Sequence, residues 1–146
     1  MAKKTGLKVI IAGGRDYTSY AGLEEAVKAS GFEIAEVVSG GAKGADSLGE
    51  SWAKNNKIPV KKFIPEWNNT NHPDAIVKFR KNPWTDAEEA YDWGAGFRRN
   101  TDMAKYADAL IALPGDGGTR DMIKKAKENN IKVFIYEEKV EITNEF

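Results

Sequence analysis

The sequence predicts a three-layer α/β domain in which a central parallel sheet of about five strands has helices on both faces. Short apolar segments, of which residues 8–12 and 109–113 are the clearest, alternate with segments of helical periodicity. Glycine-rich turns directly follow three of the apolar segments. Because parallel strands are joined by right-handed crossovers, these turns are expected together at one edge of the sheet.

The first half of the chain alternates strand and helix twice. Residues 8–12 form an apolar run that suits a strand buried on both faces. Residues 20–30 show a helical spacing of apolar side chains and are followed by Gly31, a typical helix stop. A second strand is expected at residues 32–39 and a second helix at residues 47–55.

The second half continues the alternation after a third strand, which is expected at residues 59–64. Residues 99–106 and 119–129 have helical periodicity, and the apolar runs at residues 109–113 and 132–136 suit buried strands. The whole chain, residues 1–146, is therefore expected to form a single domain.

Residues 68–94 interrupt this alternation as an insertion that is too long for an ordinary connection. Insertions near a site often act as lids or specificity loops. We expect a short helix at residues 86–92, and Trp84 and Trp93 are candidates to anchor the insertion against the body. Residues 137–146 are expected to form a tail or an edge strand.

The composition limits the classes of partner. The 146 residues include 22 basic and 22 acidic side chains and no cysteine, so no disulfide framework is expected. A nucleic-acid partner is disfavoured, since the basic run at residues 78–81 is followed closely by an acidic run at residues 86–92. His72 is the only histidine, and no metal or cofactor is expected. No signal peptide or membrane span is visible, so a cytoplasmic location without a membrane partner is expected.

The candidate site lies in the glycine-rich turns. When a strand leads through such a turn into a helix, the free backbone N–H groups at the start of the helix form a site that favours an anion. Phosphate is therefore the expected ligand. Two turns of this type, after residues 36–39 and 109–113, suggest a nucleotide ligand. The turn residues expected to bind it are Gly13, Gly14, Arg15, Gly40, Gly41, Lys43, Gly44, Asp46, Pro114, Gly115, Asp116, Gly117, Gly118 and Thr119.

Charged side chains complete the candidate site. Arg98, Arg99 and Asn100 are predicted to open a helix at the strand edge, where a forked arginine contact would hold phosphate or carboxylate. The alternative is that Arg98 and Arg99 are a solvated pair of arginines. Asp46 and Glu50 share one helix face, which suits either a ribose contact or exposed acids favoured by the helix dipole. The turn around Lys43 does not fit the Walker pattern, so no P-loop is predicted.

Four segments of the chain resemble a known superfamily: residues 11–17, 39–46, 66–67 and 95–119. They are similar to the SLOG superfamily of Rossmann-like domains, which includes the LOG phosphoribohydrolases and the DNA-processing DprA/Smf proteins, and in particular to its YspA, or cpYpsA-related, branch. The resemblance implies a Rossmann-like domain that binds a nucleotide or nucleotide-derived molecule, with Trp67 at the pocket wall. It also implies self-association as a homodimer or higher homo-oligomer.

The resemblance also bears on catalysis. The LOG segment reads Pro-Gly-Gly-x-Gly-Thr-x-x-Glu, and here residues 114–122 keep the turn and the threonine but have Met122 at the glutamate position. A thioether can neither stabilise an oxocarbenium ion nor position water. We therefore expect a binding module that acts as a sensor or sequesters its ligand, with a LOG-like phosphoribohydrolase or other nucleotide-derivative hydrolase as the alternative. The candidate catalytic residues of that alternative are Arg99, Asp121, Asp116 and Asp46.

Overall fold

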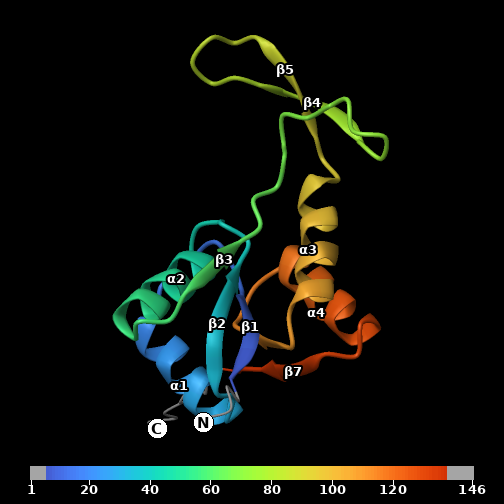
Figure 1. The fold of residues 1–146 in the computed structure, drawn as a ribbon. Coiled ribbons are helices and arrows are strands. Elements are labelled where there is room, and N and C mark those ends of the chain that lie inside the picture. Colours follow the sequence, from blue (N-terminus) through green and yellow to red (C-terminus); the bar gives the residue numbers. More distant parts are fainter. Residues whose placement is uncertain (1–5, 138–146) are drawn as a thin grey trace, which may run out of the picture.

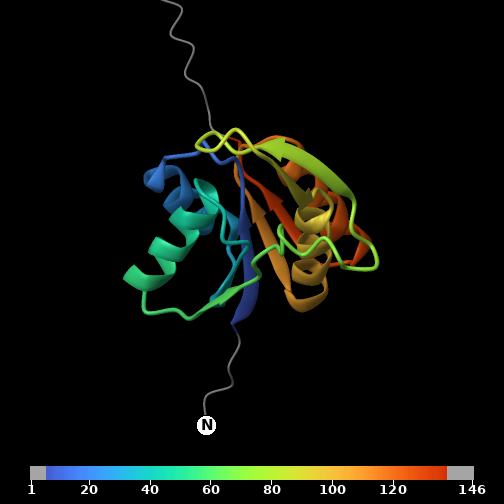
Figure 2. The same cartoon turned by 90° about the horizontal axis from the view of Figure 1, so that it is seen from above.

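A computed structural model describes residues 6–137, which fold into three layers. Five parallel strands form one sheet in the order β3-β2-β1-β6-β7. They are β1 (Leu7–Ala12), β2 (Ile34–Ser39), β3 (Val60–Lys62), β6 (Ala109–Ala112) and β7 (Lys132–Ile135). The helices are α1 (Tyr20–Ser30), α2 (Ala45–Asn55), α3 (Ala95–Tyr106) and α4 (Gly117–Glu128). Helices α1 and α2 cover one face of the sheet, and α3 and α4 cover the other (Figures 1 and 2). The predicted fold class is confirmed.

The core lies on both faces of the inner strands of the sheet, as β1 and β6 show. Val9 and Ile11 pack in the layer under α1 and α2, whereas Ile10 and Leu110 pack in the layer under α3 and α4. All four side chains are fully buried. Burial of such a side chain stabilises the fold by about 1.5–3 kcal/mol, so these strands hold the carboxyl edge of the sheet rigidly.

Local signals in the sequence explain the position of α1. Ser19 precedes the helix, and its Oγ accepts a hydrogen bond of 2.9 Å from the backbone N–H of Gly22. Gly31 follows the helix with a φ of 70°, a left-handed conformation that glycine adopts without strain. The predicted range of this helix is confirmed. The other helices begin slightly before their predicted starts, and β3 is shorter than predicted because it is an edge strand paired only with β2.

Helix α3 begins at Ala95, before the predicted start at residue 99. Gly94 and Gly96 have poor helix propensity, which makes this stretch look like a loop in the sequence. Close packing explains why glycine is used, since a Cβ on Gly96 would lie 3.0 Å from the Trp67 ring. The prediction that Arg98 and Arg99 open the helix is therefore wrong: both lie a turn further along it.

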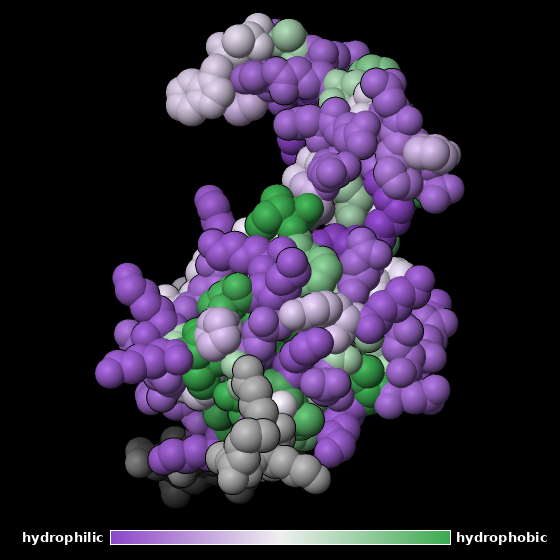
Figure 3. Space-filling model, in the orientation of Figure 1, coloured by the Kyte–Doolittle hydropathy of each residue, from purple (hydrophilic) through white to green (hydrophobic). Residues whose placement is uncertain are grey.

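The insertion forms an antiparallel hairpin of β4 (Val77–Lys81) and β5 (Glu88–Asp92). It projects from the body as an arm, and its surface is mostly hydrophilic (Figures 1 and 3). The predicted helix at residues 86–92 is wrong, because cross-strand partners of opposite charge override local propensity there. Arg80 lies opposite Glu89, and Lys81 lies opposite Glu88.

The two tryptophans of the insertion differ in their surroundings. Trp84 lies at the far end of the arm with 91% of its surface exposed, so the prediction that it anchors the insertion is wrong. Trp93 lies at the base of the arm and packs on Phe97, with ring centroids 5.1 Å apart.

The predicted tail or edge strand at residues 137–146 lies almost wholly outside the described residues. None of the helices within residues 6–137 has the length and apolar character needed to cross a membrane.

Candidate functional site

The three glycine-rich turns meet at the carboxyl edge of the sheet. The backbone N–H of Gly14 donates to the carbonyl of Pro114 at 2.8 Å, and the N–H of Ala45 donates to the carbonyl of Gly14 at 3.1 Å. A Cβ on Gly13 would lie 2.7 Å from the Ala45 side chain. Backbone contact between turns about a hundred residues apart therefore depends on glycine at these positions.

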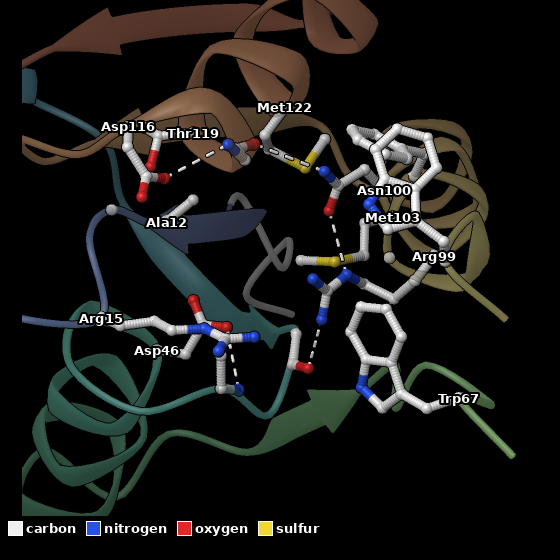
Figure 4. Close-up of a pocket in the computed structure, with 17 residues that line it drawn as sticks. Ala12, Arg15, Asp46, Trp67, Arg99, Asn100, Met103, Asp116, Thr119 and Met122 are labelled. Atoms are coloured by element: carbon white, nitrogen blue, oxygen red, sulfur yellow. Dashed lines mark hydrogen bonds between the residues drawn. The ribbon is translucent and has the colours of Figure 1, made fainter. Parts of the chain in front are cut away.

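A cavity of about 360 Å³ opens at this edge, and we call it the main cavity (Figure 4). Arg15 and Asp46 enter it from the side of the first two turns, and Arg99 and Trp67 enter it from the other side (Figure 4). Its lining residues are Ala12, Gly13, Arg15, Gly40, Ala42, Asp46, Trp67, Trp93, Gly96, Phe97, Arg99, Asn100, Met103, Asp116, Gly118, Thr119 and Met122.

Arg99 links the two halves of the main cavity. Its guanidinium donates one hydrogen bond to the carbonyl of Gly40 and another, of 2.9 Å, to Oδ1 of Asn100. Burial lowers the pKa of Arg99, the negative charge of Asp46 opposes this shift, and the positive charge of Arg15 adds to it. No carboxylate within residues 6–137 forms an ion pair with Arg99, so its positive charge is only partly compensated.

Asp46 is a buried carboxyl group in the same cavity. Burial raises its pKa, although a hydrogen bond of 3.1 Å from the backbone N–H of Ala42 and the charge of Arg99 both oppose the shift. Glu50, one turn further along α2, instead bonds Ser39 and pairs with Lys62 at 3.2 Å. The two acids that share a helix face in the sequence thus have different roles.

Aromatic side chains form one wall of the main cavity. Trp67 follows the third strand, whereas Trp93 and Phe97 come from the base of the arm and the first turn of α3. The fully buried Asp92 holds this wall in place: its Oδ1 accepts hydrogen bonds of 3.0 Å from the backbone N–H groups of Ile76 and Gly94.

Arg98 belongs to that support and does not line the main cavity. Its guanidinium pairs with Asp92 and donates a 3.0 Å hydrogen bond to the carbonyl of Asp74. The structure thus pairs Arg98 with Asp92 outside the main cavity, and its predicted contact with a ligand stays a prediction.

The start of α4 carries its own negative charge. Asp116 caps the helix, and its Oδ1 accepts a 3.3 Å hydrogen bond from the backbone N–H of Gly118. Thr119 and Met122 lie behind it, both buried and both lining the main cavity. Asp121 lies outside the lining, where it pairs with Lys125 at 2.7 Å and accepts a hydrogen bond from Asn100.

A second cavity of about 310 Å³ adjoins the first along the second turn, and we call it the cationic cavity. It contains Lys43 and Gly41, which do not line the main cavity. Its lining residues are Arg15, Gly40, Gly41, Ala42, Lys43, Ile64, Pro65, Trp67 and Arg99.

Several predicted site residues shape the turns and line neither of these cavities. They are Gly14, Gly44, Pro114, Gly115 and Gly117. Gly44 shows why: its φ of 74° is unfavourable for other residues, and a Cβ there would collide with the carbonyl of Gly14.

Two residues that line the main cavity from α3, Gly96 and Met103, were not predicted from the sequence. Together with the predicted Arg99 and Asn100 they recur at the three- and four-residue spacing of one helix face. That signal was present in the sequence, but it becomes visible only when the helix begins at Ala95.

Comparison with known proteins bears on the family and on the fold. The sequence model of the YspA, cpYpsA-related SLOG family matches residues 7–70. The SLOG resemblance is confirmed. The matched residues include the first two turns, Asp46 and Trp67, whereas α3 and α4 lie outside the match. No curated protein matches the sequence.

The fold is similar to that of a solved structure, the X-ray structure of DNA processing protein A (DprA) from Streptococcus pneumoniae. The TM-score is 0.63 at 20% sequence identity, and the match covers 94% of this chain and 52% of that chain. The chain thus spans about half the length of that protein. At this level of identity the likeness shows the fold alone.

Proposed function

We propose that the protein binds a nucleotide or nucleotide-derived small molecule in the main cavity. The observation that carries this proposal is the combination of a half-buried, incompletely neutralised guanidinium, Arg99, with the aromatic wall of Trp67 and Trp93 in one cavity. A guanidinium suits phosphate, and an aromatic wall suits a stacked base. A volume of about 360 Å³ is within the range of small-molecule sites.

We further propose that the ligand is held without turnover, so that the domain acts as a sensor or sequesters its ligand. Met122 supports this proposal, since it lines the main cavity and has only 1% of its surface exposed. The site therefore has a buried thioether where LOG-type cleavage of an N-glycosidic bond requires a carboxylate.

Native mass spectrometry of the purified protein tests the proposal. A mass excess that is released on denaturation and identified as a nucleotide-like molecule is the expected result. Arg99→Ala should lose it, whereas Arg120→Ala, an exposed arginine on α4 outside the cavity lining, should retain it. If the wild type is empty and no nucleotide added at millimolar concentration binds, the proposal is wrong.

Asp46 favours one alternative, a hydrolase of nucleotide derivatives. It is a buried carboxyl group with a raised pKa beside Arg99, an environment typical of a general acid. Asp116 is exposed, and Asp121 is engaged by Lys125, so Asp46 is the stronger candidate acid. Chromatographic detection of a free base released from nucleoside monophosphates, abolished by Asp46→Asn, would favour this alternative over the binding module.

A further inference from the structure

The cationic cavity has a charge pattern that the main cavity lacks. We propose that the ligand is a nucleoside di- or triphosphate whose phosphate chain leaves the main cavity and lies on Arg15, Lys43 and Arg99, rather than at the start of α4. This inference rests on the proposed function, because it assigns the ligand class and orientation at the same site.

Three cations line the cationic cavity without a carboxylate among the lining residues. The ion pairs within residues 6–137 leave out all three: they join Lys62 to Glu50, Lys81 to Asp86, Arg98 to Asp92 and Lys125 to Asp121. Arg15 and Arg99 are also close enough for the charge of one to lower the pKa of the other. Asp46, in the main cavity, offsets part of the charge of Arg15 and Arg99, but the lining of the cationic cavity has three cations and no carboxylate. This excess of positive charge favours an anionic ligand, and each added phosphate would relieve the repulsion between the cations.

The start of α4 is a poorer place for phosphate. Asp116 puts a carboxylate there and already accepts a hydrogen bond from the Gly118 N–H. A phosphate at this position would meet a like charge and compete for the same donor.

The geometry allows one molecule to occupy both cavities. Five residues border the two cavities in common, namely Arg15, Gly40, Ala42, Trp67 and Arg99. A base against Trp67 and Trp93 therefore leaves its phosphate chain beside Arg99, from which the path into the cationic cavity leads to Lys43.

A third cavity, on the far side of Arg98 and Arg99, does not suit the phosphate chain. Glu66, Asp74 and Asp102 are among its lining residues. Their negative charges would oppose a second phosphate, so charge directs the chain toward Lys43.

Isothermal titration calorimetry with mono-, di- and triphosphates of adenosine and guanosine tests the inference. For the base that binds, we expect the diphosphate to bind at least about tenfold more tightly than the monophosphate, since a charge-assisted contact contributes more than 1.4 kcal/mol. Lys43→Gln should abolish this advantage and leave monophosphate affinity within about twofold. The matched control is Lys54→Gln, an exposed lysine on α2 that lines neither cavity, and it should behave as the wild type.

Asp116→Asn distinguishes a phosphate chain in the cationic cavity from one at the start of α4. If phosphate lies on Lys43, this substitution should leave the affinity ratio of di- to monophosphate unchanged. Equal binding of mono- and diphosphate, insensitive to Lys43→Gln but strengthened by Asp116→Asn, would place phosphate at α4 and overturn the inference while leaving the proposed function standing. Absence of binding by every nucleotide tested would instead overturn the proposed function itself.

Discussion

Asp46 and Arg99 share the main cavity, and burial shifts the pKa of each toward its uncharged form. Burial raises the pKa of Asp46 and lowers that of Arg99, while each charge partly stabilises the other. An anionic ligand would stabilise the charged form of Arg99 and further disfavour the charged form of Asp46. The affinity of the site for an anion is therefore expected to be coupled to protonation of Asp46.

The raised pKa of Asp46 predicts a pH dependence of stability. Between the ordinary pKa of an aspartate, which applies in the unfolded state, and the raised pKa of the folded state, the folded state binds a proton that the unfolded state has released. The free energy of unfolding contributed by this group therefore falls as the pH rises through that window. Relative to Asp46→Asn, the wild type should lose stability over the same interval, as measured by urea denaturation at a series of pH values.

Asp102→Asn is the control for this measurement, because Asp102 is an exposed aspartate on α3. Its curve should run parallel to that of the wild type. Parallel curves for Asp46→Asn and the wild type would mean that burial does not control the ionisation of Asp46.

Two glycines of the second turn should respond differently to alanine. A Cβ on Gly40 would lie 2.8 Å from the Arg99 guanidinium carbon and 2.9 Å from Oδ2 of Asp46, which are ends of side chains that can move. Gly40→Ala should therefore weaken nucleotide binding about tenfold or more with little loss of stability, by displacing Arg99. Gly44→Ala meets backbone at a positive φ and should destabilise the fold by at least about 2 kcal/mol.

Denaturant unfolding and calorimetric titration of both variants check this contrast. An equal loss of stability in the two variants would contradict the expected contrast, because it would mean that the Arg99 side chain cannot move to accommodate the added methyl group.

At the scale of elements, the arm and α3 form one support for the aromatic wall. The N–H of Asp92 donates to the carbonyl of Trp67 at 2.7 Å, and the N–H of Trp93 donates to the carbonyl of Ile76 at 2.9 Å. With the carboxylate of Asp92 bound to Arg98, these contacts tie the segments before and after the arm to α3. The arm itself adds little charge overall, because its basic strand lies opposite its acidic strand.

Asp92→Asn should loosen the base of the arm. The asparagine side chain can still accept hydrogen bonds from the backbone N–H groups of Ile76 and Gly94, but Arg98 loses its charged partner. We expect this loss to lower the free energy of unfolding by about 1–3 kcal/mol. Hydrogen exchange should become faster at the Trp93 amide and stay unchanged in β1. Asp86→Asn removes an exposed ion pair with Lys81 and should change neither. Uniform acceleration across the sheet would show that Asp92 supports the whole fold rather than the arm.

At the scale of the whole molecule, the arm is separate from the core. The hairpin residues contribute to neither core cluster, and most of their side chains are exposed. Val77 lies opposite Asp92, so a two-residue Asn-Gly turn can replace residues 78–91. The shortened protein should unfold cooperatively within about 5 °C of the wild-type midpoint and still bind nucleotide, as measured by thermal denaturation and calorimetric titration. Loss of folding would show that the arm supports the sheet.

The expected homodimer stays a prediction, as do the cytoplasmic location and the absence of a nucleic-acid partner. Helices α2 and α4 lie on opposite faces of the sheet (Figure 2). Light scattering after size-exclusion chromatography should give twice the monomer mass of 16.1 kDa. A monomer mass at all concentrations tested would contradict this expectation.

The sequence alone determined the alternation of strands and helices and the convergence of the three turns, because both follow from local periodicity and the handedness of crossovers. Tertiary structure decided the roles of adjacent residues. Arg98 and Arg99 look alike in the sequence, but the start and phase of α3 direct one to Asp92 and the other into the main cavity. The sequence also did not predict the structure of the arm, since cross-strand charge pairs made residues 88–92 a strand instead of a helix. Such contacts join residues far apart in the chain or depend on where a helix begins, and a local pattern does not encode them.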